Sequence, residues 1–135
     1  MTKTTNYQLN QWAKSDRVMM DDFNADNAKI DAALAAKSRV ITGTYTGTGK
    51  DNREIALGTR PKAVLVCTEY GVMWTSGGVY GGLALDGTPT KARTDTGTVY
   101  SLVTITDTGF KLRQPGNSYI QGNASNTVYH YIAFC

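Results

Sequence analysis

The chain has 135 residues, of which 41% are hydrophobic and 19% charged, and its formal net charge is +3. This length suits one domain with a short appendage and allows a buried core without metals or disulfides. The sequence has no dense stripe of Lys and Arg of the kind found in nucleic-acid-binding proteins, so we expect no nucleic-acid partner. No apolar run approaches the ~20 residues of a membrane span, so we expect no membrane insertion.

The N-terminal part of the chain predicts an arm followed by a helix. Residues 1–10 are predicted to be extended, Ser15 or Asp16 is the predicted N-cap, and the helix is expected to reach about Lys37. The first residues contain no apolar segment of the signal-peptide kind, so we expect synthesis in the cytoplasm.

A narrow stripe of mostly apolar residues runs along the predicted helix at the a and d positions of a heptad. Its members are Met20, Phe23, Asn27, Ile30 and Leu34. Because so thin a stripe cannot form a core with itself, the same helix from another copy is the simplest neighbour that covers it. The lone Asn at an a position costs stability but fixes register and strand number. We therefore interpret the helix as an oligomerisation stem. Packing against its own domain is the alternative, and the heptads alone do not separate a dimer from a trimer.

Composition changes abruptly after the helix and divides the chain into an arm with a helical stem, residues 1–38, and a head, residues 39–135. Residues 1–36 hold four basic and five acidic side chains, whereas residues 37–135 hold ten and six. A mildly basic head favours an acidic surface such as a phosphate-bearing glycan.

Alternating patterns, β-branched residues and turn residues predict short strands throughout the head. The predicted strands are Val40–Thr46, Arg53–Leu57, Ala63–Thr68, Val79–Leu85, Val99–Thr106, Phe110–Arg113 and Val128–Phe134. Because Ala63–Thr68 is nearly all apolar, we expect it to be a central strand buried on both faces. Thr88–Thr98 is polar and is predicted to be irregular. Short strands at this spacing, without helical patterns between them, predict a mainly β fold: an N-terminal α-helix followed by an antiparallel β-sandwich of about six strands.

Motifs in the N-terminal part resemble the N-terminal module of tail-fibre proteins in phages and prophages of Gram-positive gut bacteria. The similarity covers most of residues 6–36. Its motifs are Asn6-Tyr7-Gln8-Leu9-Asn10-Gln11-Trp12, Asp16-Arg17-Val18, and Asp22-Phe23-Asn24-Ala25-Asp26-Asn27-Ala28-Lys29-Ile30-Asp31-Ala32-Ala33-Leu34.

Motifs in the head are similar to the C-terminal tips of such fibres and to H-type lectins, which are six-stranded antiparallel sandwiches that trimerise and bind sugars. They are Gly43-Thr44-Tyr45, Arg60-Pro61-Lys62-Ala63-Val64-Leu65-Val66, Thr108-Gly109-Phe110 and Tyr129-His130-Tyr131-Ile132-Ala133-Phe134. The resemblance implies a homotrimeric receptor-binding protein in the phage virion. Its implied partners are itself, a host cell-surface polysaccharide, and other tail or baseplate proteins.

Loop aromatics and amides supply the residue types that carbohydrate binding needs. Aromatic faces stack on sugar rings, and amide groups form hydrogen bonds with hydroxyls. The candidate ligand-binding residues are Tyr70, Trp74, Tyr80, Asn117, Tyr119, Asn123 and Asn126. The alternative is that the aromatic rings cap the core edge while the asparagines only turn the chain.

Catalytic and metal-binding patterns are not evident. His130 is the only histidine, and we expect it to be a core or interface residue. Cys67 is predicted to be a small buried hydrophobe, and a Cys67–Cys135 pair stays open. Glu54 and Glu69, the only glutamates, do not form an evident catalytic pair. We therefore expect no cofactor and no enzymatic activity. The expected function is adhesion by a fibre tip, with a structural or adaptor role in the tail or baseplate as the alternative.

Overall fold

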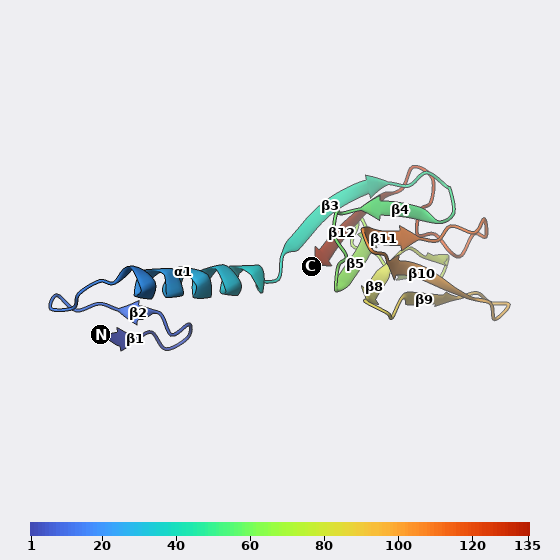
Figure 1. Cartoon of the computed structure of the whole chain (residues 1–135). Coiled ribbons are helices and arrows are strands. Elements are labelled where there is room, and N and C mark those ends of the chain that lie inside the picture. The colour runs from blue at the N-terminus through green and yellow to red at the C-terminus, as the bar shows by residue number, and fades with distance from the viewer. The chain divides into compact units, whose positions relative to one another are not determined.

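The computed structural model describes all 135 residues, which form two compact units, Met1–Ser38 and Arg39–Cys135. We call them the stem and the head. The chain is mainly β, with several antiparallel sheets and a single α-helix (Figure 1).

The arm of the stem is a hairpin, not the extended segment expected from the sequence. Strands β1 (Thr2–Lys3) and β2 (Asn10–Gln11) pair antiparallel. The turn between them is closed by Thr4, whose N–H donates to the Leu9 carbonyl at 2.8 Å and whose hydroxyl accepts from the Leu9 N–H at 2.9 Å. Gln8 adopts a φ of 56° in this turn. Glycine is the usual residue at a positive φ, and this turn has none, so the sequence does not indicate the turn.

Helix α1 spans Met20–Ala35 and begins later than the sequence indicates. Met19 is the N-cap residue and provides no side-chain hydrogen bond, so the predicted cap at Ser15 or Asp16 is wrong. Asp16 instead closes a turn before the helix by accepting from the Ala13 N–H at 2.8 Å. The acidic side chains of Asp21 and Asp22 lie in the first turn, where the helix dipole favours negative charge.

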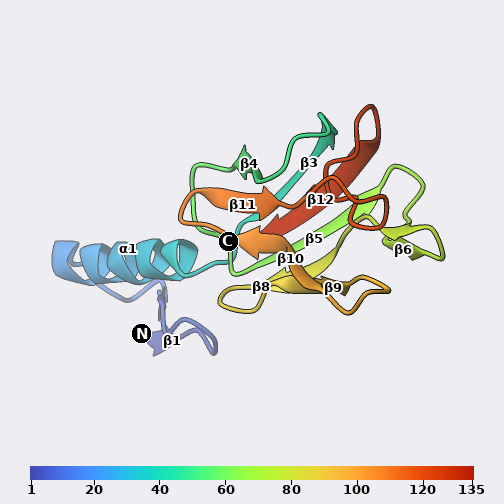
Figure 2. The ribbon, with the colours of Figure 1, turned by 90° about the vertical axis from the view of Figure 1, so that its right-hand side faces the viewer.

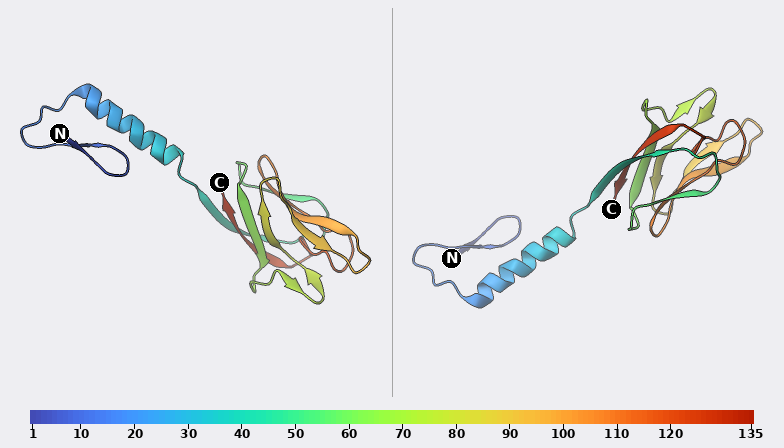
Figure 3. Two further views of the ribbon diagram at one scale, coloured as in Figure 1. Left: turned by 90° about the horizontal axis from the view of Figure 1, so that it is seen from below. Right: turned by 90° about the horizontal axis from the view of Figure 1, so that it is seen from above.

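The head contains two four-stranded antiparallel sheets. The β12 sheet has the order β3 (Val40–Thr46), β12 (Val128–Phe134), β5 (Ala63–Thr68) and β8 (Gly82–Leu85). The β10 sheet has the order β4 (Arg53–Ala56), β11 (Gly109–Leu112), β10 (Val99–Ile105) and β9 (Thr90–Arg93). Figure 3 shows β12 in red between β3 and β5. The two sheets therefore hold eight strands, which corrects the prediction of about six. Strand β9 lies within Thr88–Thr98, so the prediction that this segment is irregular is wrong.

Both sheets contribute to one buried core. The β12 sheet supplies Val64, Val66, Ala84, Tyr129 and Ala133, and the β10 sheet supplies Ala92, Leu102, Val103, Ile105, Phe110 and Leu112. Most of these positions follow the two-residue period of strands, which sends alternate side chains to opposite faces. Leu102 and Val103 are adjacent core residues because the register of β10 against β9 shifts between Ser101 and Val103.

Strand β5 is buried on one face only, which corrects the expectation of burial on both. Val64 and Val66 are fully buried, whereas Ala63, Leu65 and Cys67 on the opposite face are only half-buried. Cys67 is thus not a buried hydrophobe. Both Cys67 and Cys135 are free thiols.

Candidate ligand-binding and self-association surfaces

Two loops meet at one end of the head. The first loop, residues 69–81, carries a small hairpin made of β6 (Trp74–Thr75) and β7 (Gly78–Val79). The second loop, residues 113–127, joins β11 to β12. The Val79 N–H donates to the Tyr119 carbonyl at 2.8 Å, and the Gln121 N–H donates to the Val79 carbonyl at 2.9 Å. Figure 2 shows the β6 hairpin beside this second loop.

Asn117 shapes the second loop from within. Its Oδ1 accepts hydrogen bonds from the backbone N–H groups of Tyr119, at 2.9 Å, and Ile120, at 2.7 Å. This is the local turn that asparagine side chains commonly stabilise. The arrangement fixes the position from which the Tyr119 side chain projects.

Aromatic side chains from both loops gather at this end of the head. Trp74 Nε1 donates to the Tyr119 hydroxyl at 3.0 Å, which joins the hairpin to the second loop. Tyr70 is 84% exposed and Trp74 is also mostly exposed, while Tyr80 and Tyr119 are half-buried. Of the candidate ligand-binding residues, these four aromatics and Asn117 therefore belong to one region of the surface.

A cavity of about 270 Å³ opens beside these aromatic side chains. It is lined by Thr68, Glu69, Tyr70, Val72, Thr75, Tyr80, Thr127 and Val128. Two tyrosine rings, one carboxylate and three hydroxyl-bearing threonines make it amphipathic and without a basic side chain. Its volume lies just below the ~300 Å³ at which pockets for drug-sized ligands begin, so it suits a small ligand.

Glu69 and the threonines of this site are not evident from the sequence alone. Glu69 directly follows the end of β5 and precedes the exposed Tyr70. Thr127 and Val128 come from the far end of the chain, and only the pairing of β12 with β5 brings them alongside Thr68. That pairing was the signal needed to find them.

Asn123 and Asn126 have other surroundings. Asn123 is fully buried. Its Oδ1 accepts from the Thr48 N–H and from Arg53 Nη1, and its Nδ2 donates to the Thr48 hydroxyl and the Lys50 carbonyl. No polar atom of this side chain is left for a ligand. Asn126 is exposed at a turn with a φ of 61°, and its N–H donates to the Gly47 carbonyl at 3.0 Å.

Two stacked tyrosines anchor the segment around Asn123. The rings of Tyr45 and Tyr129 lie 4.7 Å apart and almost parallel. The Tyr45 hydroxyl donates to the Gly122 carbonyl at 2.8 Å, and the Tyr129 hydroxyl accepts from the Ala124 N–H at 3.0 Å. Burial raises the pKa of both phenols, so both stay protonated and able to donate. These contacts attach the part of the second loop around Gly122 and Ala124 to the buried tyrosine pair.

In the stem, the arm binds a polar side of α1. The Asn10 N–H donates to Asp26 Oδ2 at 2.8 Å, and the Asn10 side chain donates to the Asp22 carbonyl at 3.3 Å. Lys29 Nζ donates to the Gln8 carbonyl at 2.7 Å. The chain thus uses its own arm to satisfy polar groups of the helix.

The apolar stripe of α1 remains uncovered. At ~100° per residue, Met20, Phe23, Asn27, Ile30 and Leu34 lie about 110° around the helix from the residues that face the arm. All five are exposed, with Met20 at 77% and Leu34 at 64%, and α1 has no buried residue. The stem itself therefore leaves this stripe largely uncovered.

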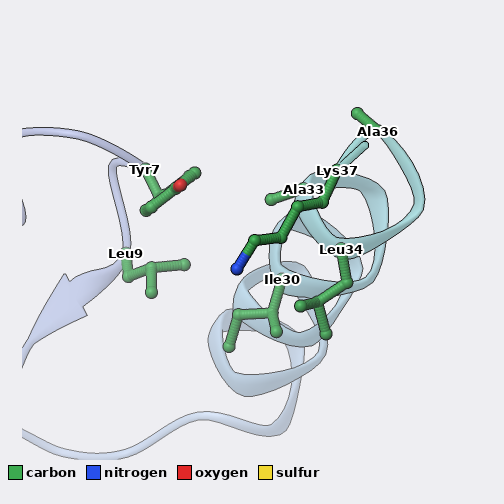
Figure 4. A pocket seen from close by; sticks show the side chains of 7 residues that line it. All are labelled: Tyr7, Leu9, Ile30, Ala33, Leu34, Ala36 and Lys37. Atoms are coloured by element: carbon green, nitrogen blue, oxygen red, sulfur yellow. The ribbon is translucent and has the colours of Figure 1, made fainter. Parts of the chain in front are cut away.

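Beside the stripe lies a groove of about 480 Å³. Tyr7 and Leu9 form one wall and helix residues form the other, as Figure 4 shows. Ile30 and Leu34 belong both to the stripe and to this groove, together with Ala33, Ala36 and Lys37. The groove widens the apolar surface from a thin line to a concave strip.

The structure bears on three further features. His130 is exposed, so the alternative that placed it in the core is wrong. No three or more His, Cys, Asp or Glu side chains gather in a group able to hold a metal ion. The sixteen-residue α1 does not meet the length and apolarity of a membrane-crossing helix.

No protein-family model, curated protein or solved structure matches this chain.

Proposed function

We propose that this chain is the receptor-binding protein of a phage tail fibre, a trimeric adhesin that recognises a host cell-surface glycan. The observation that carries the proposal is the cavity beside Tyr70, with Tyr70, Trp74, Tyr80 and Tyr119 gathered at one end of the head. Aromatic faces stack on the apolar face of a sugar ring, and carboxylate and hydroxyl groups pair with its hydroxyls.

The charge of the cavity lining indicates which class of glycan the cavity suits. Glu69 is its only charged lining residue, and an acidic sugar would meet that carboxylate without a compensating base. The sequence suggested a phosphate-bearing glycan because of the basic head, whereas the cavity favours a neutral sugar. In this proposal the basic side chains elsewhere on the head steer it towards an anionic cell surface, while the cavity makes the specific contacts.

The proposal includes a finer description of the head as an H-type-lectin-like β-sandwich. Two antiparallel four-stranded sheets that share one core support this description. The strand after Pro61, the turn before Phe110 and the final strand ending Ile132-Ala133-Phe134 are the parts that carry the likeness.

Trimerisation through the stem makes weak sugar contacts effective. The uncovered stripe and the adjoining groove on α1 give each copy a surface that another copy can cover. Linking three heads raises avidity by ~10²-fold or more without any new contact. We place the protein in the virion, where other tail or baseplate proteins hold the fibre.

A second candidate function is that of a structural or adaptor component of the tail, without a ligand of its own. The groove lined by Tyr7, Leu9, Ile30 and Leu34 favours it, because a helix from another tail protein would fit the same apolar surface. The two candidates differ in whether the head binds cells.

The test uses the full chain, fluorescently labelled, on a panel of Gram-positive gut bacteria and on a glycan array. We expect wild-type protein to bind cells and to lose binding after periodate oxidation of their glycans, but not after protease treatment. Tyr70→Ala and Trp74→Ala should each weaken binding by about tenfold or more, because each removes an exposed aromatic face.

Val99→Ala is the matched control, because Val99 is exposed on the β10 sheet and does not line the cavity. Binding that survives periodate, or that is equal in wild type, Tyr70→Ala and Trp74→Ala, contradicts the glycan site. A wild-type protein that binds no cells or glycans but captures a tail protein through the stem supports the adaptor role.

A further inference from the structure

The carboxylate of Glu69 has no basic partner, although it belongs to a head rich in basic side chains. Residues 37–135 hold ten basic and six acidic side chains. Of the six acids, three aspartates pair with arginines, and Glu54 accepts from the hydroxyls of Thr106 and Thr108. Glu69 takes part in none of the ion pairs of the chain, and no basic side chain lines its cavity. The cavity therefore presents an uncompensated negative charge.

A tight turn at the end of β5 holds the backbone that carries this carboxylate. Glu69 and Tyr70 occupy the two central positions of the turn. The Gly71 N–H closes the turn by donating to the Thr68 carbonyl at 2.8 Å. The Glu69 N–H donates to the Val128 carbonyl at 2.9 Å, which joins the turn to β12. A site whose groups are already held in place loses less conformational entropy when a ligand binds.

The two tyrosines of the cavity lack the cation that two other tyrosines of the head have. The Arg53 guanidinium lies 5.3 Å from the ring centre of Tyr45, and the Arg113 guanidinium lies 5.4 Å from that of Tyr100. The negative face of an aromatic ring attracts a cation at such distances. The chain places no cation of its own over either tyrosine of the cavity. A cation brought by a ligand is therefore a group that both rings and the carboxylate attract.

The residue types of the lining favour an organic cation over a metal ion. Calcium takes about six to eight oxygen ligands, many of them carboxylates, whereas Glu69 is the only acidic side chain of the cavity. Two aromatic rings beside one carboxylate suit an organic ammonium group. The threonines of the lining add hydroxyl oxygens that accept from N–H groups. A primary ammonium has N–H donors for these oxygens and a quaternary ammonium has none, so the lining favours the primary ammonium.

We propose that this cavity binds a primary ammonium group of the host glycan, carried by an amino sugar or by an amino acid esterified to the glycan. The Glu69 carboxylate pairs with the ammonium, and Tyr70 and Tyr80 pack against it and the adjoining sugar ring. This inference rests on the proposed function, because it names the substituent that the glycan site recognises. The same carboxylate disfavours acidic sugars, so the inference narrows the remaining sugars to those with a free amine.

Each contact in such a site is weak, which agrees with binding by several linked heads. Glu69 is exposed, so water and salt screen its pairing with the ammonium. A cation beside an exposed ring also gains little from that ring. We expect the contacts together to favour a free amine over its acetylated form by about fivefold. This preference should shrink as the salt concentration rises.

Binding of the labelled full chain to chemically modified cells tests this proposal. Cells are first treated with protease to remove protein amines and then with acetic anhydride, which converts the remaining amines into neutral amides. We expect acetylation to weaken wild-type binding by about fivefold or more. Because acetylation makes the cell surface more negative, non-specific attraction of the basic head would change binding in the opposite direction.

Glu69→Gln removes the charge of the side chain and keeps its size. It should weaken binding to unacetylated cells by about fivefold, and acetylation should then weaken binding by less than about twofold more. Asp95→Asn is the matched control, because Asp95 also makes no ion pair, lies in the turn between β9 and β10, and does not line the cavity. It should bind like wild type. Unaltered circular dichroism and thermal unfolding of both variants exclude misfolding.

Mild alkaline treatment of the cells separates the two sources of the amine, because it hydrolyses esters and leaves amino sugars intact. Binding that is lost after this treatment assigns the ammonium to an esterified amino acid, and binding that survives it assigns the ammonium to an amino sugar.

The outcomes distinguish this proposal from the proposed function. If binding is sensitive to periodate but not to acetylation, the ammonium proposal is overturned and the glycan site stands, whether or not Glu69→Gln weakens binding. Equal binding of wild type and Glu69→Gln to unacetylated cells also overturns it. A wild-type chain that binds no cells and no glycans overturns both proposals.

Discussion

At the scale of single residues, Tyr129 links the core to the loop that borders the candidate site. Its ring stacks on Tyr45, and its hydroxyl accepts from the Ala124 N–H and donates to the Gln121 carbonyl. A buried polar group that loses its partner costs about 1–3 kcal/mol, because the group stays desolvated. One phenol oxygen therefore holds two backbone groups in place.

Tyr129→Phe should lower the free energy of unfolding by about 1–3 kcal/mol, because it leaves the Ala124 N–H and the Gln121 carbonyl without that partner. Urea unfolding followed by fluorescence measures the change. Tyr131→Phe on the same strand is the control, since its ring packs edge-on against Phe110 and its hydroxyl takes no part in these contacts. Equal stability losses in the two variants would contradict the role given to Tyr129.

The Arg60 guanidinium makes the stability of the head depend on pH. Its Nε and Nη2 donate to the two carboxylate oxygens of Asp86 at 3.0 and 2.6 Å, and its Nη1 pairs with Asp107. The hydrogen bonds from Arg60 lower the pKa of Asp86 in the folded chain. Because the folded pKa lies below the unfolded one, this stabilisation is present above the ordinary aspartate value of about 3.9 and is lost as pH falls through the folded value.

Asp86→Asn should therefore flatten part of the acid dependence of stability. Between about pH 5 and about pH 3, the urea midpoint of wild type should fall further than that of Asp86→Asn. Asp95→Asn, in the turn between β9 and β10, removes a carboxylate that makes no ion pair and should keep the wild-type dependence. Parallel pH profiles for wild type and Asp86→Asn would refute the assignment.

At the scale of elements, the stem presents different sides of one helix to different neighbours. The arm occupies the side that bears Asp22, Asp26 and Lys29, and the stripe from Met20 to Leu34 stays open. Asn27 is the one polar member of that stripe. A buried asparagine at an a position gives up stability for a defined register.

Asn27→Leu should tighten the assembly several-fold and broaden the distribution of oligomer sizes, because an apolar side chain replaces the residue that specifies strand number. Sedimentation velocity reports both effects. Ala25→Leu adds a similar side chain on the opposite side of the helix and should change neither. Weaker assembly of Asn27→Leu would show that the stripe is not an interface between helices.

Elements with strong periodic patterns were predictable, and those that depend on tertiary contacts were not. Val40–Thr46 and Val128–Phe134 match β3 and β12 because their side chains alternate over seven residues. Strand β9 was missed because only Ala92 of its four residues is buried. The hairpin of the arm depends on a positive φ at Gln8, and no glycine in the sequence indicates a turn there.

The residues of the candidate site were predictable only in part, because their burial also depends on tertiary contacts. Exposed aromatics in loops stood out by residue type, and the structure gathers Tyr70, Trp74, Tyr80 and Tyr119. By residue type, Asn123 cannot be told from an exposed loop amide. Its side chain is nevertheless buried and forms hydrogen bonds with Thr48 and Lys50. Which loop amides are buried depends on the pairing of distant segments, and local sequence carries no signal of that pairing.

At the scale of the whole molecule, the proposals assign separate tasks to separate surfaces. In these proposals, the end of the head that carries the cavity binds the ligand, and the stripe on α1 binds other copies. A single sugar contact is weak, so adhesion depends on several heads acting together. Self-association is therefore the claim on which the proposed function depends.

Sedimentation equilibrium of the unmodified full chain at micromolar concentration tests that claim most directly. Our account predicts a single species with three times the 14.6 kDa mass of the chain. A species with the mass of one chain, unchanged as the concentration rises, would contradict it.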